Sequence, residues 1–506
     1  MRRDYGDFQT PPGLVSAVLG RLGPIGARWP RVFEPTCGRG HFLAGLLALD
    51  PPPREVLGVE VQSGHLEAAR VVANTAPREV RVGLTAGSFF DLDLKSLAWA
   101  DPTGPLLVVG NPPWITSAEL GTLGSTNRPR RSNPKSIRGI DAITGASNFD
   151  AAEAVWLKLL TELADQSPTV ALLCKTAVAR NVLEHARRLG LPIAHAEVVR
   201  VDARAWFSAS VDACLLRITL GEKQTHPLDR IPVYSDMNSR VPESAMGFAR
   251  ARLVVDFDAY TRVSAVDGTC PIAWRQGLKH DASAVMELTS ERRNGLGGAV
   301  EVEDERVFPL LKGSDLARPR PIAPGRAVLV TQRTIGDDTN RLERDAPRLW
   351  AYLQQHAGAF DRRKSSVYRG RPPYSMFGIG PYAFAPFKVA VSGLHKNPVF
   401  HAVGSVDGQP VMCDDTSYYL SCRSAEQAAL IETLLNQPTP IDLLRSFTTP
   451  GAKRSVTKAA LQRLDLATLL ARSDVRTVLD AAENTVTRLT GQTARWPDRL
   501  LELLEP

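Results

Sequence analysis

The sequence has few cysteines and no long apolar run, and both absences exclude whole classes of protein. Its 506 residues include six cysteines, which are scattered and form no CxxC pair, so neither a disulfide framework nor a zinc site is expected. No apolar stretch reaches the roughly 20 residues that cross a bilayer, and residues 1–10 are polar and charged, which does not fit a signal peptide. We therefore expect a reduced protein of the cytoplasm with no membrane attachment.

Positive charge is only in mild excess, and its distribution is more informative than its amount. The net charge is +7, with 61 basic and 54 acidic residues. Two segments are rich in basic residues, 128–138 and 362–371, and the first contains no acidic residue. In the second, Tyr368 lies among the basic residues, and Tyr374 and Phe377 follow. A solvated loop is the ordinary explanation of such a cluster, whereas a surface that contacts phosphates and bases fits the second segment better.

The N-terminal half alternates strands and helices. Strands are predicted at residues 31–34, 55–60, 80–84, 105–109, 169–174, 195–199 and 212–219, and helices at residues 13–22, 41–49, 64–73 and 151–163. This alternation predicts an open α/β sheet with helices on both faces. The alternation fades from about residue 225. We therefore expect three parts, which are residues 1–222, an α+β domain at residues 223–450 and a helical segment at residues 451–506.

The ends of two predicted strands indicate a cofactor site. Ligands of open α/β sheets bind at the carboxyl ends of the strands. Residues 33–42, FEPTCGRGHF, combine a strand end, a glycine loop and a helix start, and Gly38 and Gly40 let the backbone pass close to a ligand. A dinucleotide fold would have GxGxxG, and here the third glycine is missing. Glu60 ends the next strand, where a carboxylate accepts hydrogen bonds from both hydroxyls of a ribose. Together these residues predict an adenosine-containing cofactor.

A second pattern, at the end of the strand at 105–109, indicates the chemistry. The strand runs into Gly110-Asn111-Pro112-Pro113-Trp114. Two prolines cannot continue a hydrogen-bonded ladder, so they form a rigid turn with free carbonyl oxygens. The Asn111 amide oxygen and the Pro112 carbonyl suit an NH₂ group, and Trp114 offers an aromatic face to a planar substrate. Orientation of the amine, rather than a strong base, would supply most of the catalysis.

At these residues the chain resembles the gamma class of DNA amino-methyltransferases, in which the cofactor half precedes the catalytic motif and a target-recognition domain follows. The resemblance covers most of the chain. It implies a Rossmann-like sheet that binds S-adenosylmethionine, and a C-terminal α+β domain that binds double-stranded DNA. The residues that match the family's cofactor motifs are Thr10 in the leading segment, Glu34, Pro35, Cys37, Gly38 and Gly40 in the methionine-binding loop, Glu60 at the ribose-binding strand end, and Asn111.

The resemblance also assigns a catalytic set. Asn111, Pro112, Pro113 and Trp114 match the family's signature for exocyclic nitrogens, and Phe207 falls where the family stacks an aromatic ring on the flipped base. A core aromatic is the alternative for Phe207. Residues 148–149 are similar to a family segment that packs near the cofactor.

One position departs from the family pattern. The family has an acid followed by an aromatic residue after the third strand, and the chain has Ser88 and Phe89 there, with Asp91 three residues after Ser88. Either Ser88 or Asp91 is therefore the candidate contact to the cofactor's adenine amine.

The C-terminal half resembles the recognition domains of these enzymes in three segments, which are residues 274–281, 310–315 and 374–380. Aromatic, glycine and basic residues mixed on short strands suit a surface that approaches a duplex backbone. A plain α+β accessory domain is the alternative. We find no second catalytic constellation, so a restriction endonuclease is expected to be a separate protein.

These observations together predict an S-adenosylmethionine-dependent enzyme that methylates adenine N6 in DNA, as the modification component of a restriction-modification or phage-defence system. Four alternatives remain at this point. The same motif can present cytosine N4, an RNA base or a protein glutamine amide, and a catalytically silent DNA-binding module would keep the fold alone.

Overall fold

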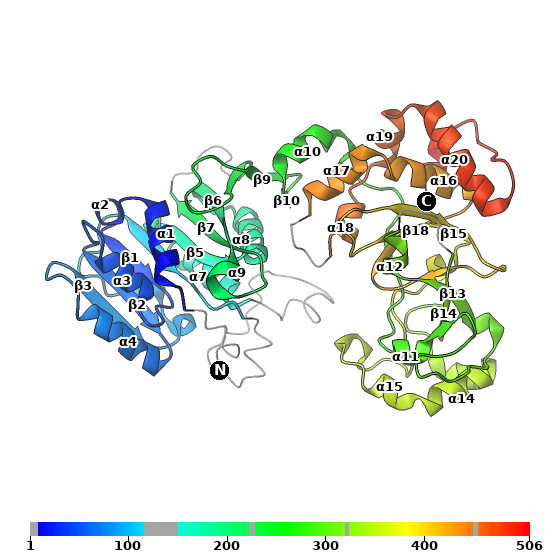
Figure 1. The fold of residues 1–506 in the computed structure, drawn as a ribbon, viewed down its shortest axis with the longest axis horizontal. Helices are drawn as coiled ribbons and strands as arrows, with labels where there is room; N and C mark the ends of the chain where they lie inside the picture. The colour runs from blue at the N-terminus through cyan, green and yellow to red at the C-terminus, as the bar shows by residue number, and fades with distance from the viewer. Residues whose placement is uncertain (1–8, 116–149, 222–227, 319–322, 449–453, 506) are drawn as a thin grey trace. The chain divides into compact units, whose positions relative to one another are not determined.

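The computed structural model describes residues 9–115, 150–221, 228–318, 323–448 and 454–505. The chain forms two compact units, Met1–Asp258 and Ala259–Pro506, which are coloured from blue to green and from green to red in Figure 1. Among the described residues, no helix combines the length and the apolar character that a membrane span requires.

The N-terminal unit is built on a mixed sheet of ten described strands. Their order is β10-β9-β8-β6-β7-β5-β4-β1-β2-β3. The strands are β1 (Arg31–Glu34), β2 (Glu55–Glu60), β3 (Arg81–Ala86), β4 (Leu106–Gly110), β5 (Thr169–Lys175), β6 (Ile193–Val201), β7 (Ala213–Leu220), β8 (Ile231–Tyr234), β9 (Ser244–Ala249) and β10 (Arg252–Val254). Strands β1 to β5 are mutually parallel, and β7 runs antiparallel to both β5 and β6.

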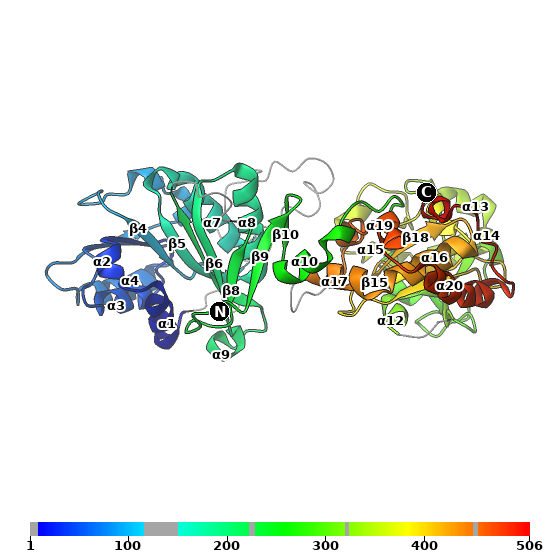
Figure 2. The ribbon, with the colours of Figure 1, turned by 90° about the horizontal axis from the view of Figure 1, so that it is seen from above.

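Helices cover both faces of this sheet, as the sequence predicts. The helices are α1 (Pro12–Leu22), α2 (Ile25–Arg28), α3 (His41–Leu47), α4 (Ser63–Ala73), α7 (Ala151–Glu162), α8 (Thr176–Leu189) and α9 (Ala203–Phe207). Figure 2 shows α1, α3 and α4 on one face and α7 and α8 on the other. The central strands β1 and β4 are buried along their whole length, because a parallel strand covered on both faces has no solvent side.

The sheet reverses its strand order between β1 and β4. The chain moves outward from β1 to β2 and β3, and then returns to the other side of β1 with β4. Phe33 of β1 pairs with Val108 of β4, so the two strands end side by side. The loop after Glu34 and the loop after Gly110 therefore start from the topological switch point, where open α/β sheets bind their ligands.

The C-terminal unit contains two four-stranded sheets among its described residues, in the orders β11-β18-β15-β16 and β12-β14-β13-β17. The strands are β11 (Arg275–Gln276), β12 (Glu287–Thr289), β13 (Val307–Leu311), β14 (Arg326–Leu329), β15 (Phe387–Ser392), β16 (Phe400–Val403), β17 (Met412–Cys413) and β18 (Ser417–Cys422). Helix α16 (Ala425–Leu435) packs on β15 and β16 and against α20 (Val475–Thr490).

The remaining helices of this unit are short. They are α10 (Phe257–Val263), which spans the boundary, α11 (Ser283–Met286), α12 (Gly313–Leu316), α13 (Leu342–Asp345), α14 (Pro347–Gln355), α15 (Ala357–Asp361), α17 (Pro438–Ser446), α18 (Lys458–Leu461) and α19 (Leu466–Ala471). The mixture of small sheets and helices is the α+β architecture expected for this half.

The boundary between the units differs from the one expected at residues 222–223. It falls after Asp258, because β8 pairs with β6, and β9 and β10 continue the same sheet. The helices after residue 454 likewise belong to the C-terminal unit, since α20 packs on α16. All six cysteines are free and buried.

Candidate active site

The glycine loop after β1 is shaped by close backbone contacts. Gly40 has φ 84° and caps the N-terminus of α3, a left-handed conformation that favours glycine. A Cβ at Gly40 would lie 3.1 Å from the Ala69 Cα of α4. The loop is tied to β2 because the Cys37 N–H donates to the Val59 carbonyl (2.8 Å). The left-handed backbone and the close approach of α4 therefore both require a glycine where α3 begins.

The Glu60 carboxylate organises the same loop. It ends β2, and its two oxygens accept hydrogen bonds from the N–H groups of Gly38 (2.9 Å) and Gln62 (2.7 Å). These bonds fix the carboxylate beside the glycine loop. Each carboxylate oxygen carries two lone-pair positions, so the Glu60 carboxylate can still accept hydrogen bonds from ribose hydroxyls.

Three buried polar atoms around this loop have no hydrogen-bond partner within the described part of the chain. They are Glu34 Oε2, Thr36 Oγ1 and His41 Nδ1. Burial raises the pKa of Glu34 well above its usual value, and the nearby Glu60 carboxylate adds to that rise. Buried polar groups normally have partners. A cluster of orphaned donors and acceptors therefore fits a bound ligand with polar ends, such as the amino-acid part of S-adenosylmethionine.

The leading segment lies against the glycine loop. The Arg39 N–H donates to Gln9 Oε1 (3.3 Å), and a Cβ at Gly38 would lie 3.1 Å from the same oxygen. Thr10, the next residue, is buried. The structure thus brings Gln9 to residues 38–39, about 30 positions away in sequence, with Thr10 next to it in the chain. Asp7 and Phe8 lie outside the described residues.

The Asn-Pro-Pro-Trp corner follows β4 beside the glycine loop. A Cβ at Gly110 would lie 3.5 Å from Glu34 Cγ, so the start of the corner touches the end of β1. The Trp114 indole N–H donates to the Leu173 carbonyl of β5 (3.4 Å), which fixes the ring. Asn111 and Pro113 are partly exposed, whereas Pro112 and Trp114 are buried.

Phe207 joins this corner from a distant part of the chain. It ends the short helix α9, and its ring lies edge-on to Trp114, with centroids 5.2 Å apart and planes at 71°. Phe207 is half-buried. Asp202 caps α9 by accepting from the N–H groups of Arg204 and Ala205, which holds the aromatic ring in position.

Sequence reasoning missed an ion pair next to the corner. Asp150 caps α7, accepts from the Ala152 N–H, and pairs with Lys175 at the end of β5 (2.8 Å). The Ala151 N–H donates to the Ile115 carbonyl directly after Trp114. Burial raises the pKa of Asp150, although Lys175 opposes that rise. An aspartate directly before a helix is a recognisable cap, but its pairing with Lys175 is long-range. Residues 148–149 lie outside the described residues.

The residues after β3 give less support to the cofactor contacts predicted for them. The Ser88 hydroxyl accepts from the Phe90 N–H (3.2 Å), and Asp91 is exposed. Phe89 is buried and stacks on Phe33, with centroids 6.4 Å apart. The roles of Ser88, Phe89 and Asp91 in cofactor binding stay predictions.

The basic segment at residues 362–371 divides into structural and exposed side chains. Arg363 donates to the carbonyls of Phe360 and Ser375 and lies 3.8 Å above the Tyr368 ring. Tyr374 is buried. The exposed cations of the segment are Arg362, Lys364, Arg369 and Arg371. The other basic segment, residues 128–138, lies outside the described residues.

The three recognition-like segments meet at one turn, which sequence reasoning did not identify. Gly313 N–H donates to the Asp414 carboxylate (3.1 Å), the Asp414 N–H donates to the Leu311 carbonyl, and the Leu278 N–H donates to the Cys413 carbonyl. The backbones of Lys279 and Phe377 exchange two hydrogen bonds, in which each N–H donates to the other residue's carbonyl (2.9 Å). Segments separated by up to 135 residues therefore form one surface.

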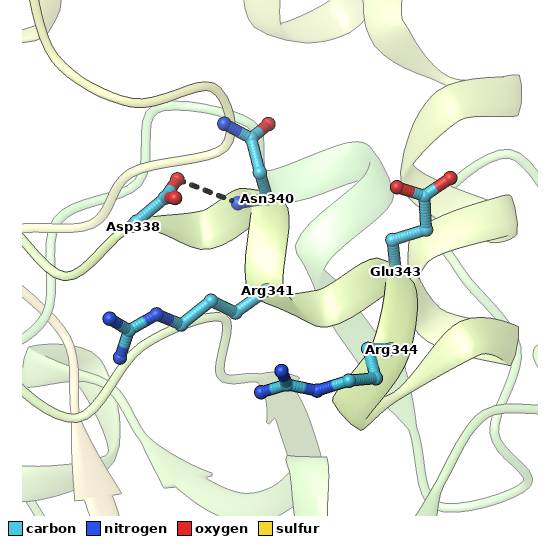
Figure 3. A pocket seen from close by; sticks show the side chains of 5 residues that line it. All are labelled: Asp338, Asn340, Arg341, Glu343 and Arg344. Carbon is cyan, nitrogen blue, oxygen red and sulfur yellow. Dashed lines mark hydrogen bonds between the residues drawn. The ribbon is translucent and has the colours of Figure 1, made fainter.

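A shallow hollow of about 360 Å³ lies elsewhere in the C-terminal unit, at the start of α13. Polar and charged residues line it, and Figure 3 shows Arg341 and Arg344 extending to the same side, with Glu343 pointing away. The lining residues are Asp338, Asn340, Arg341, Glu343 and Arg344. It holds none of the residues predicted to bind the cofactor or to act in catalysis.

The sheet and its strand-end loops define the class of fold, a Rossmann-like α/β sheet with its candidate site at the carboxyl ends of the strands. A solved structure of the type IIL restriction-modification enzyme MmeI in complex with DNA shares the fold over 97% of this chain and 74% of its own, with a TM-score of 0.54 and 12% identity. The match to the M protein of the type I restriction enzyme EcoKI covers 52% of this chain and 54% of that protein at 15% identity, with a TM-score of 0.33.

Sequence comparison identifies the family. The chain is 33% identical over 478 residues to the type II methyltransferase M.NspV from Nostoc sp. (strain ATCC 29411 / PCC 7524), a match that covers 92% of this chain and 97% of that protein. No family model matches the chain. The chain belongs to the type II methyltransferases.

Proposed function

We propose that this protein transfers a methyl group from S-adenosylmethionine to the N6 amine of an adenine that has been turned out of a DNA duplex. One observation carries the proposal. The Asn111 corner and the glycine loop start from neighbouring strand ends, so close together that a Cβ at Gly110 would lie at van der Waals distance from the Glu34 side chain. A base amine held at the corner would therefore be adjacent to the cofactor's binding loop.

In this proposal the glycine loop binds the cofactor. Glu60 accepts from the ribose hydroxyls, and Glu34, Thr36, His41 and Thr10 surround the methionine end. When bound, S-adenosylmethionine supplies an electrophilic methyl group. No metal or strong base is required by this proposal, because alignment of the amine supplies much of the rate.

The corner holds the substrate. The two hydrogens of the adenine amine donate to Asn111 Oδ1 and to the Pro112 carbonyl, so that the nitrogen lone pair faces the methyl group. Trp114 and Phe207 line the base's place with aromatic surface, which offsets part of the stacking lost when the base leaves the duplex. The indole–carbonyl bond to Leu173 keeps this surface rigid.

The C-terminal unit would bind the duplex. Its exposed cations at residues 362–371 suit phosphates, and the surface around Asp414 suits base edges. The likeness to a type II methyltransferase and to a restriction-modification enzyme supports a role as a modification enzyme. In this proposal the endonuclease is a separate protein.

The test is transfer of a labelled methyl group from S-adenosylmethionine to duplex DNA, RNA and protein offered in parallel. We expect label in DNA. Asn111→Ala should lose at least 100-fold of the transfer rate, in the range that removal of one positioned hydrogen-bonding group costs, and should keep cofactor affinity. Glu60→Ala should lose cofactor binding measured by calorimetry. Label in RNA or protein, with none in DNA, would contradict the proposal.

A further inference from the structure

The surface around Asp414 carries a compact group of charged side chains, which we call the Lys279 cluster: Lys279, Asp281 and Asp415. The Lys279 ammonium lies 2.7 Å from the Asp281 carboxylate and 3.7 Å from that of Asp415. About a third of each side chain is exposed, 30% for Asp281 and 32% for the other two. One ammonium therefore faces two carboxylates, and all three groups remain open to a ligand.

The backbone holds this cluster rigidly. Lys279 is fixed between two hydrogen bonds to Phe377, and Gly277 passes so close to residue 414 that a Cβ would lie 2.1 Å from the Asp414 carbonyl. The Gln276 amide donates to the Asp415 carbonyl (2.7 Å), and Arg454 donates to the same oxygen (3.2 Å). The charged groups are thus presented from a close crossing of segments rather than from a loose loop.

Cations suited to phosphates border the cluster. Tyr368 and Arg363, which stack at 3.8 Å, lie close enough to Asp281 for its carboxylate to add to the rise that burial causes in the pKa of Tyr368 and to oppose the lowering of the pKa of Arg363 by burial. The exposed Arg369 and Arg371 follow Tyr368 directly in the chain. A duplex whose backbone contacts these arginines would bring its base edges to the cluster, since phosphate contacts fix register and groove contacts read sequence.

Stability does not account for the cluster. A partly exposed ion pair contributes about 0 to 1 kcal/mol, and the second carboxylate repels the first. Asp281 also has a left-handed backbone, with φ 53°, and residues held in such regions are concentrated at functional sites. Three charged side chains are partly buried where these segments cross. A ligand that replaces their ion pairs with contacts of its own explains this arrangement better than stability does.

We propose that the Lys279 cluster reads one G·C base pair of the DNA target in the major groove. Guanine presents N7 and O6 as acceptors, and its partner cytosine presents the N4 amine as a donor. The Lys279 ammonium donates to guanine, and Asp281 or Asp415 accepts from the cytosine amine. An A·T pair places an adenine amine against the ammonium, and so is disfavoured. This inference rests on the proposed DNA methylation.

The experiment maps methylated sites in DNA from cells that lack other DNA methylation and express the full chain. The wild-type motif should contain at least one invariant G·C pair. Lys279→Ala and Asp415→Asn should broaden the motif at that pair, with preference for it falling roughly 10- to 100-fold, and leave the other positions unchanged. Lys279→Arg, which keeps both the charge and the guanine contacts, should retain the motif.

Two controls separate reading from folding. Asp442→Asn removes a comparable ion pair, Asp442 with Arg445 at 3.1 Å, in helix α17, and should leave the motif unchanged. Melting temperatures of all variants should stay close to wild type, and Asp415→Asn preserves side-chain volume if Lys279→Ala fails to fold. A wild-type motif with no G·C pair, or an unchanged motif in the Lys279 and Asp415 variants, would overturn the base-reading site alone. Complete absence of methylated DNA would overturn the proposed function as well.

Discussion

The buried Lys388 ammonium allows a quantitative prediction for the stability of the C-terminal unit. It lies on β15 between β16 and β18, is 1% exposed, and donates to the Ala385 carbonyl (2.8 Å). Burial lowers the pKa of Lys388 from 10.5 to about 8, since the thiols of Cys413 and Cys422 compensate only in part. This lowering of the Lys388 pKa corresponds to roughly 3 kcal/mol of destabilisation at neutral pH.

Lys388→Met should therefore raise the stability of the C-terminal unit at pH 7 by up to about 3 kcal/mol, less the lost hydrogen bond of about 1 kcal/mol. The sign also fixes a pH dependence. In the folded state the lysine loses its proton near pH 8 and in the unfolded state near pH 10.5, so the penalty is fully present below pH 8 and disappears as pH rises to 10.5.

The assay is thermal unfolding of the full chain at pH 7, 9 and 10.5, with Lys458→Met on the exposed surface of α18 as the matched control. The gap between wild type and Lys388→Met should be largest at pH 7 and should shrink toward pH 10.5, while the control shows no such trend. A Lys388→Met protein that is less stable than wild type at pH 7, or a gap that does not change with pH, would refute this reasoning.

Three further predictions concern the N-terminal unit. Gly40→Ala should cost roughly 1–2 kcal/mol from the left-handed backbone alone and should weaken S-adenosylmethionine binding in calorimetry. Gly20→Ala, with open space around it in α1, should stabilise the helix slightly and leave cofactor affinity unchanged; equal cofactor affinity in both variants would contradict the loop's role. Burial opposes ionisation of Glu197, but hydrogen bonds from His195 and Arg21 outweigh it and lower the Glu197 pKa to about 2. Glu197→Gln should therefore lower the free energy of unfolding in urea by about 3 kcal/mol at pH 7, and this difference from wild type should vanish as pH falls from 4.5 to 2. Phe207→Ala should raise the KM for DNA and reduce the fluorescence of a 2-aminopurine placed at the target base, with Phe207→Tyr close to wild type; an unchanged Phe207→Ala would make Phe207 a core residue.

Local sequence predicted the strands that carry the candidate site. The strands expected at residues 31–34 and 55–60 are confirmed residue for residue, because each is a short, fully buried run between turns. The link between Gly38 and Glu60 follows from the same geometry, since parallel strands β1 and β2 end at one edge. Hydrophobic periodicity and turn residues determine structure over a few neighbouring positions, and these two strands depend on such local patterns alone.

Long-range pairing could not be predicted in the same way. Strand β8 joins the sheet through β6 rather than through its sequence neighbour β7, and β9 and β10 continue from β8, so the expected boundary at 222–223 precedes the observed one. The Asp150–Lys175 pair and the Asp414 turn likewise depend on segments 25 to about 140 residues apart. In each case the residue types were unremarkable in isolation, and only the fold gives them partners.

Nucleoside mass spectrometry of methylated DNA tests the central claim most directly. Duplex DNA incubated with the wild-type chain and S-adenosylmethionine should contain N6-methyladenine, and DNA incubated with Asn111→Ala should not, although calorimetry finds that variant still bound to the cofactor. N4-methylcytosine in place of N6-methyladenine would contradict the proposed base, and equal methylation by Asn111→Ala would contradict the proposed role of the corner.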